Sequence, residues 1–198
     1  VIPPRKPIPV SIQQYGAPFW SKFVSDMIYR LQYNGFKWED RPYEDLIKEY
    51  PTCATALKWW CNVSQGKTSQ YTIQRAPYLK EFMVQNPPNF KVSDKCCLYS
   101  KKIPSKEYRK DKGFDLQCLG IRLAEEGVRA GSIKHCYSES SDIDSYRPVF
   151  YFKDDDKKQY AEHYKIKFSD CYEKYGLYRT GCFGCPFGKR FEEELECI

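Results

Sequence analysis

The stretch LQCLGIR, from Leu116 to Arg122, decides how the second half of this chain is interpreted. It is a short apolar run without a helical repeat, and this pattern predicts a buried strand. A second run, Arg147 to Phe152, predicts another strand, with Pro148 near its start, where a missing N–H is tolerated. The acidic residues 154–156 then predict the first turn of a helix that ends near Tyr164. Strands that alternate with helices indicate the α/β class.

The residues before this region predict helices. After Pro18, apolar side chains recur at helical spacing as far as Asn34, and similar patterns follow Pro42 and cover about 52–61. Residues 1–90 are therefore interpreted as a mainly helical segment. Three stretches of the chain predict irregular structure. They are a proline-rich extended segment at 1–18, a polar loop at 62–70 and a glycine-rich cysteine loop at 169–188.

Composition restricts the class of protein. The 198 residues, 41% of them hydrophobic, suffice for one globular unit, and no apolar run is long enough to span a bilayer. A net charge of +6, spread along the sequence, suits an anionic ligand better than the phosphate backbone of a nucleic acid. Ten cysteines with a C-x-x-C pair fit a metal site in a reducing compartment better than secreted disulfides. We therefore expect a cytoplasmic protein without a membrane partner.

Four cysteines form the candidate metal site. Cys182 and Cys185 make a C-x-x-C pair in a glycine-rich loop, and Cys96 and Cys97 supply two adjacent thiols. Adjacent cysteines suit a cluster with several iron atoms better than a single tetrahedral zinc, whose ligand pairs are usually spaced by two to four residues. The neighbouring Lys95 is expected, with Lys101 and Lys102, to favour the deprotonated thiols. The alternative is that Cys96 or Cys97 is a small buried apolar residue, as predicted for Cys53, Cys61, Cys118 and Cys136.

The order of these motifs resembles a known family. Adjacent cysteines, 84 intervening residues and then C-x-x-C are similar to the cluster signature of the assimilatory adenylylsulfate reductases, within the phosphoadenosine phosphosulfate (PAPS) reductase family. Residues 120–129 resemble the family's GIRxxES segment, and residues 15–22 resemble a GxPxxSK stretch of a bacterial branch. The resemblance implies a 4Fe–4S cluster on Cys96, Cys97, Cys182 and Cys185. It also implies that residues 91–198 belong to an adenine-nucleotide α-hydrolase-like (PP-loop) fold.

The chain departs from the family at several places. Members carry an amino-terminal SGGxDS loop, and no such segment occurs here, because residues 64–69 have Gln65 in place of the first glycine. We therefore expect this chain to be the carboxy-terminal part of a longer protein. Glu126 stands where the family has serine, which implies a changed anion affinity or a different substrate. Cys197 is not followed by Gly-Leu-His, so it is not interpreted as the family's tail nucleophile.

The resemblance implies a sulfonucleotide reductase or an ATP-dependent sulfurtransferase, in which Arg122, Arg129, Lys95 and Glu125 contribute to the pocket for an adenine (sulfo)nucleotide. A protein that donates or accepts sulfur is an implied partner, and a homo-oligomer is left open. The fragment alone is not expected to turn over. Two alternatives stay open: a zinc-binding structural module without chemistry, and a nucleic-acid-binding role that would use the positive charge. For the arginines, the alternative is surface pairing with Glu125, Glu126 or Asp115.

Overall fold

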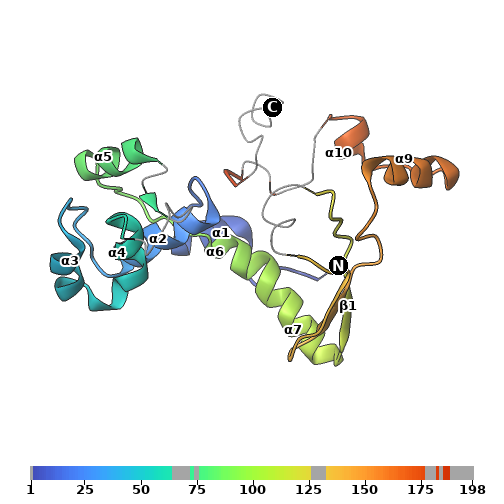
Figure 1. The fold of residues 1–198 in the computed structure, drawn as a ribbon, viewed down its shortest axis with the longest axis horizontal. Helices are drawn as coiled ribbons and strands as arrows, with labels where there is room; N and C mark the ends of the chain where they lie inside the picture. The colour runs from blue at the N-terminus through green and yellow to red at the C-terminus, as the bar shows by residue number, and fades with distance from the viewer. Residues whose placement is uncertain are drawn as a thin grey trace. The chain divides into compact units, whose positions relative to one another are not determined.

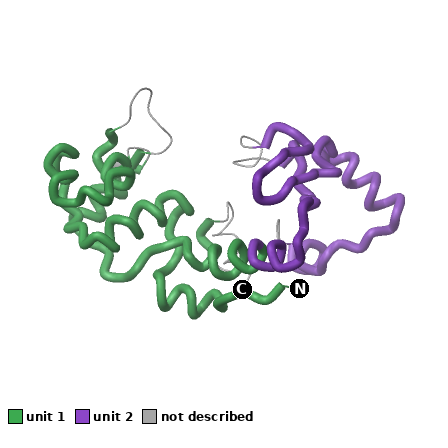
Figure 2. The backbone as a smooth tube through the Cα atoms, turned by 90° about the horizontal axis from the view of Figure 1, so that it is seen from below, with its two compact units in different colours: residues 1–105, 181–198 green, residues 106–180 purple. Residues whose placement is uncertain are grey.

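A computed structural model describes residues 2–63, 72–73, 76–125, 133–176, 182 and 185–187. The chain divides into two compact units, residues 1–105 with 181–198, and residues 106–180 (Figure 2). All four cysteines of the candidate metal site belong to the first unit, and Arg122 belongs to the second. Each unit is described by itself.

The first unit is helical, as predicted for residues 1–90. Helices α2 (Lys22–Tyr33), α3 (Tyr43–Glu49) and α4 (Ala54–Trp60), the last preceded by the 3-10 turn Pro51–Cys53, confirm the three predicted helical patterns (Figure 1). Ser21 caps α2, because its hydroxyl accepts a hydrogen bond from the amide of Val24 at 3.2 Å. Further helices are α1 (Ile8–Tyr15), α5 (Pro77–Gln85) and α6 (Lys95–Cys97). A π-helical turn (Leu98–Lys102) joins α6 to α7 (Ile103–Lys112), which begins in this unit and has most of its residues in the second.

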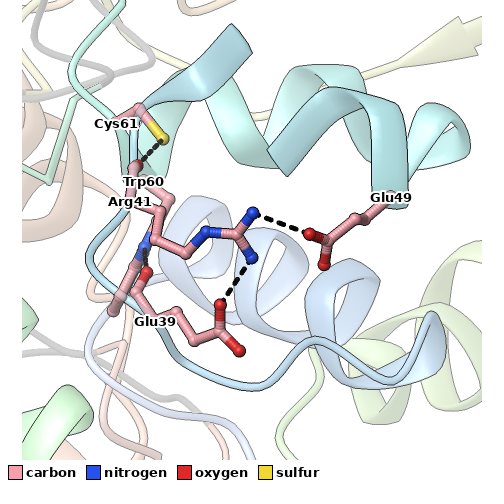
Figure 3. A network of polar contacts seen from close by, with 5 residues as sticks. All are labelled: Glu39, Arg41, Glu49, Trp60 and Cys61. Atoms are coloured by element: carbon pink, nitrogen blue, oxygen red, sulfur yellow. Dashed lines mark hydrogen bonds and ion pairs between the residues drawn. The ribbon is translucent and has the colours of Figure 1, made fainter. Parts of the chain in front are cut away.

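Aromatic side chains form the centre of this helical core. The ring of Trp60 is fully buried and lies edge-on to Phe36 and Trp38, with centroid separations of 5.6 Å for both pairs. Its indole N–H donates to the carbonyl oxygen of Glu39 at 2.9 Å. Figure 3 shows Arg41 next to this contact, with its guanidinium bridging the carboxylates of Glu39 at 2.8 Å and Glu49 at 2.7 Å. The loop before α3 is therefore fixed to α3 and α4 by polar contacts as well as by packing.

The extended conformation predicted for residues 1–18 is wrong, because residues 8–15 form α1. Proline is tolerated in the first turn of a helix, where its missing N–H has no intrahelical partner, and Pro9 occupies that turn. The helix ends at Gly16, with φ of 113° and ψ of 163°. The chain then continues into Ala17, which makes an isolated parallel bridge to Val92.

The second unit contains a small mixed sheet with strand order β1-β3-β2. Strand β1 (Leu116–Cys118) pairs in parallel with β3 (Asp144–Tyr146), and β2 (Tyr137–Ser138) pairs antiparallel to β3. The unit also carries α9 (Asp154–His163), which confirms the predicted helix, and α10 (Asp170–Glu173). The protein is thus a mixed helix-and-strand protein, in agreement with the coarse class predicted. Among the described residues, no helix has the length and apolarity that a bilayer crossing requires.

Three details of this unit differ from the sequence predictions. Strand β1 stops at Cys118, and its outer positions are exposed, with Leu116 45% accessible, so it is not a fully buried strand. Residues 147–152 do not form a strand, because Pro148 cannot donate to a ladder and the amide of Phe150 turns back to the carbonyl of Arg147 at 3.1 Å. The sheet uses the preceding polar residues instead. The loop predicted at 169–188 contains α10, whose start is capped by the Ser169 hydroxyl.

Candidate functional site

A backbone contact with the end of α1 fixes the segment that leads to the adjacent cysteines. The amide of Ala17 donates to the carbonyl of Lys91, and the amide of Ser93 donates to the carbonyl of Ala17, each at 2.9 Å. The buried hydroxyl of Ser93 also donates to the carbonyl of Gly16 at 3.4 Å. A Cβ atom on Gly16 would lie 2.4 Å from the backbone of Lys91, so only glycine permits this approach. The position of the segment before Cys96 is therefore set by α1.

The two adjacent cysteines lie on α6 at the start of a π-helical turn. Helix α6 begins after Asp94, whose carbonyl accepts from the amide of Cys97 at 3.1 Å. Cys96 is buried, with 6% of its surface exposed, and Cys97 is half-buried. The Ser100 hydroxyl donates to the carbonyl of Cys96 at 2.6 Å. π-Helical turns are rare and are frequent at functional sites, so this local structure is compatible with a functional role for the adjacent thiols.

The C-x-x-C pair closes a turn. The amide of Cys185 donates to the carbonyl of Cys182 at 3.1 Å, and both residues are half-buried. Cys185 lies close enough to Cys96 for its charge to raise the pKa of the Cys96 thiol. Cys185 therefore acts on Cys96, although 88 residues lie between them in the sequence.

Burial is the main influence on the Cys96 thiol. It raises the pKa of Cys96 to about 11, and the neighbouring thiols of Cys97 and Cys185 add to the effect. The prediction that nearby lysines would favour the thiolate is wrong for Cys96. The Lys95 ammonium instead lies over the ring of Tyr29, 5.0 Å from its centroid. A bound cation would reverse this preference, because a thiol that coordinates a metal is deprotonated.

The four cysteine sulfurs are suitable metal donors, but the structure does not bring them together as a complete set of ligands. Among the residues that the structure describes, no three His, Cys, Asp or Glu side chains stand close enough to hold one ion. The chemistry of four sulfur donors, two of them adjacent, suits an iron–sulfur cluster and also zinc. Cys96, Cys97, Cys182 and Cys185 thus stay predicted ligands.

The other cysteines divide by burial. Cys53 is buried, which confirms its prediction as a small core residue, and Cys61 and Cys136 are half-buried. Cys118 is exposed on β1, so its predicted burial is wrong. The nine cysteines that the structure describes are all free thiols. Cys197 lies outside the described residues.

Of the predicted anion-binding residues, Arg122 and Glu125 lie in the second unit, whereas Lys95 lies in the first. The Arg122 side chain is 17% exposed, and its Nη2 pairs with Asp154 Oδ1 at 2.9 Å. Its backbone N–H donates to Glu125 Oε1 at 3.2 Å. The surface-pairing alternative is thus met in part, with Asp154 as the partner rather than Glu125 or Asp115. Arg129 lies outside the described residues, as do residues 64–69 and Glu126.

One buried charged residue, Arg147, was not singled out as a site residue from the sequence. It directly follows β3 and is 8% exposed. The signal available in the sequence was an arginine at the start of an apolar run, between strand residues and Pro148. Charged side chains are seldom buried without a partner, so such an arginine marks either an internal ion pair or a ligand site.

Comparison with known proteins identifies no relative. The sequence matches no protein-family model and no curated protein. The geometry of the cysteines and arginines, together with the motifs, therefore carries the functional argument.

Proposed function

We propose that this chain is the cluster-bearing part of a PAPS reductase-like protein, either a sulfonucleotide reductase or an ATP-dependent sulfurtransferase with a PP-loop fold. Cys96, Cys97, Cys182 and Cys185 hold a 4Fe–4S cluster in this proposal. The observation that carries it is the placement of two adjacent thiols, the buried Cys96 and the half-buried Cys97, on α6 where a π-helical turn begins. Burial disfavours the Cys96 thiolate, so a deprotonated Cys96 would need a bound cation to neutralise it.

The residues around α6 prepare this site. The Ser93 hydroxyl accepts from the amide of Lys95 at 3.3 Å, which orders the first turn of α6. The Ser100 hydroxyl occupies the carbonyl of Cys96, and burial of Cys96 keeps water from that sulfur. When bound, the cluster would stabilise the fold and, through its charge, polarise an anionic substrate. Lys95 would add a positive charge beside it.

Metal analysis tests the cluster. Protein prepared without oxygen is expected to be brown, with about four iron atoms and four sulfides per chain. Cys96→Ser is expected to lose most of this iron, whereas Cys118→Ser, which removes an exposed thiol on β1, is expected to retain it. A colourless protein with about one zinc ion per chain would instead support the structural module.

Nucleotide binding tests the catalytic class separately. Calorimetry with adenylylsulfate, PAPS and ATP is carried out on the longest natural protein that contains this chain. Binding of a sulfonucleotide supports a reductase, and binding of ATP alone supports a sulfurtransferase. If the protein holds a metal and binds none of the three, the non-catalytic module is favoured. A complex with nucleic acid that disappears only at high salt would favour the nucleic-acid alternative.

A further inference from the structure

Arg147 carries a buried positive charge without a carboxylate partner among the described residues. Its Nη1 donates to the carbonyl of His135 at 3.0 Å and to the Ser138 hydroxyl at 3.3 Å, and its Nη2 donates to the same hydroxyl at 3.3 Å. These acceptors are neutral. In the described part of the chain, its Nε is buried and has no hydrogen-bond partner. Such a charge is costly to bury unless an anion neutralises it.

Arg122, like Arg147, has a buried guanidinium nitrogen, Nη1, without a hydrogen-bond partner among the residues that are described. Its other terminal nitrogen pairs with Asp154, whose side chain is 74% exposed. Asp154 compensates the charge of the Arg122 guanidinium, so the charge that lacks compensation is that of Arg147.

The sheet brings the two arginines to the same edge. Strands β1 and β3 are parallel, with Cys118 opposite Tyr146, and both arginines lie beyond the carboxyl ends of these strands. The segments continue side by side, because the amide of Leu119 donates to the carbonyl of Tyr146 at 2.9 Å and the amide of Leu123 to that of Phe150 at 2.7 Å. The carboxyl edge of parallel strands is where ligands bind in sheets of this kind.

We infer that Arg147 and Arg122 hold one tetrahedral oxyanion, a phosphate or sulfate group, at this edge of the sheet. The buried Nε–H of Arg147 and the Nη1–H of Arg122 donate to its oxygens, and the charge of Arg147 is the one that the anion neutralises. Arginine suits this role because its planar guanidinium donates several hydrogen bonds in fixed directions. The inference deepens the proposed function: the group held here would be the phosphate or sulfate of the sulfonucleotide.

The alternative for Arg147 is a purely structural one, in which its guanidinium only ties the loop at His135 and the strand β2 to the end of β3. Two variants separate these roles. Arg147→Gln removes the charge, whereas Ser138→Ala removes the hydroxyl that accepts from both terminal nitrogens and keeps the charge. Lys110→Gln, at an exposed position of α7, controls for the loss of one positive charge.

In the experiment, the full chain is titrated with inorganic phosphate and with sulfate, and binding is measured by calorimetry. Arg147→Gln is expected to weaken phosphate binding about tenfold or more, since a hydrogen bond to a charged group is lost. Ser138→Ala and Lys110→Gln are expected to change it less than about threefold. Equal weakening by Arg147→Gln and Lys110→Gln would show a nonspecific charge effect and overturn the inference.

A second measurement does not depend on the variants folding. In the unsubstituted chain, phosphate is expected to shift the side-chain Nε–H nuclear magnetic resonance signal of Arg147. No phosphate or sulfate binding by the unsubstituted chain would overturn the inference, even if the protein held iron. Conversely, phosphate binding by a protein that binds neither a sulfonucleotide nor ATP would support the anion site and refute the proposed function.

Discussion

Replacement of Gly16 by alanine tests whether α1 positions the cysteine segment. Gly16 ends α1 with φ of 113° and ψ of 163°, a region of backbone conformation that is almost restricted to glycine. The added Cβ would lie 2.4 Å from the carbonyl carbon and oxygen of Lys91 and 2.7 Å from the amide nitrogen of Val92. Because these neighbours are backbone atoms, no side-chain rotation can relieve the contact. The segment that precedes Cys96 must move.

The cost follows from two contributions. A non-glycine residue in this conformation costs about 1–3 kcal/mol. Displacement of residues 91–93 also breaks the hydrogen bonds from Ala17 to Lys91 and from Ser93 to Ala17, each worth about 1 kcal/mol. Together these give a loss of about 3–5 kcal/mol in the free energy of unfolding. This is a large part of the total stability of an ordinary domain, about 5–15 kcal/mol.

Gly35→Ala is the matched control. Gly35 also has positive φ, at 70°, but a Cβ there would meet no atom within 4 Å. It should therefore show only the backbone penalty, about 1–2 kcal/mol. All four tryptophans lie between residues 20 and 60, in the first unit, so urea unfolding followed by tryptophan fluorescence reports on this unit alone. If Gly16→Ala is no more destabilising than Gly35→Ala, the contact between α1 and the cysteine segment does not support the site as argued.

Three further predictions concern the core, a surface ion pair and the thiols. Trp60→Phe is expected to destabilise the first unit by about 2–4 kcal/mol in urea unfolding, because it opens a cavity and leaves the carbonyl of Glu39 without its donor; a loss below about 0.5 kcal/mol would contradict this packing. The hydrogen bond from Arg41 lowers the pKa of Glu49 below its ordinary value of 4.5. The ionised Glu49 therefore contributes to the free energy of unfolding above pH 4.5, and this contribution is lost as the pH falls through the lowered pKa. Glu49→Gln should therefore flatten the fall of the urea midpoint with pH below 4.5, and an unchanged slope would count against the pair. Cys96→Ser should leave the secondary structure, measured by circular dichroism, intact while it removes bound metal; full metal content would exclude Cys96 as a ligand.

Helices were predictable where apolar spacing alone decides them. Helix α2 buries Met27, Ile28 and Leu31, the positions that its repeat indicates. Helix α1 was not predictable in the same way, because four prolines before residue 10 predict extended backbone, and only Pro9 falls within the helix. The prediction of the strands was wrong for a different reason. The sheet has only short strands with exposed positions, so apolar runs do not mark them, and β3 is formed by the polar residues Asp144–Tyr146.

In the candidate site, the residue types could be predicted from the sequence, but their surroundings could not. The sequence identifies which side chains can bind a metal, because two cysteine pairs are visible as a pattern. It does not reveal that Cys96 is buried and Cys118 exposed, since burial depends on contacts between distant segments. Arg147 illustrates the converse: its residue type is visible, but its lack of a carboxylate partner among the described residues appears only in three dimensions.

The two proposals rest on separate units of the chain, and this makes them independently testable. The four predicted metal ligands lie in residues 1–105 and 181–198, whereas Arg122 and Arg147 lie in residues 106–180. Iron content therefore reports on the packing of the first unit around α6, and phosphate affinity reports on the edge of the sheet in the second. A sulfonucleotide enzyme of the proposed kind would need both properties. A protein with only one of the two properties would keep that site and lose the enzyme assignment.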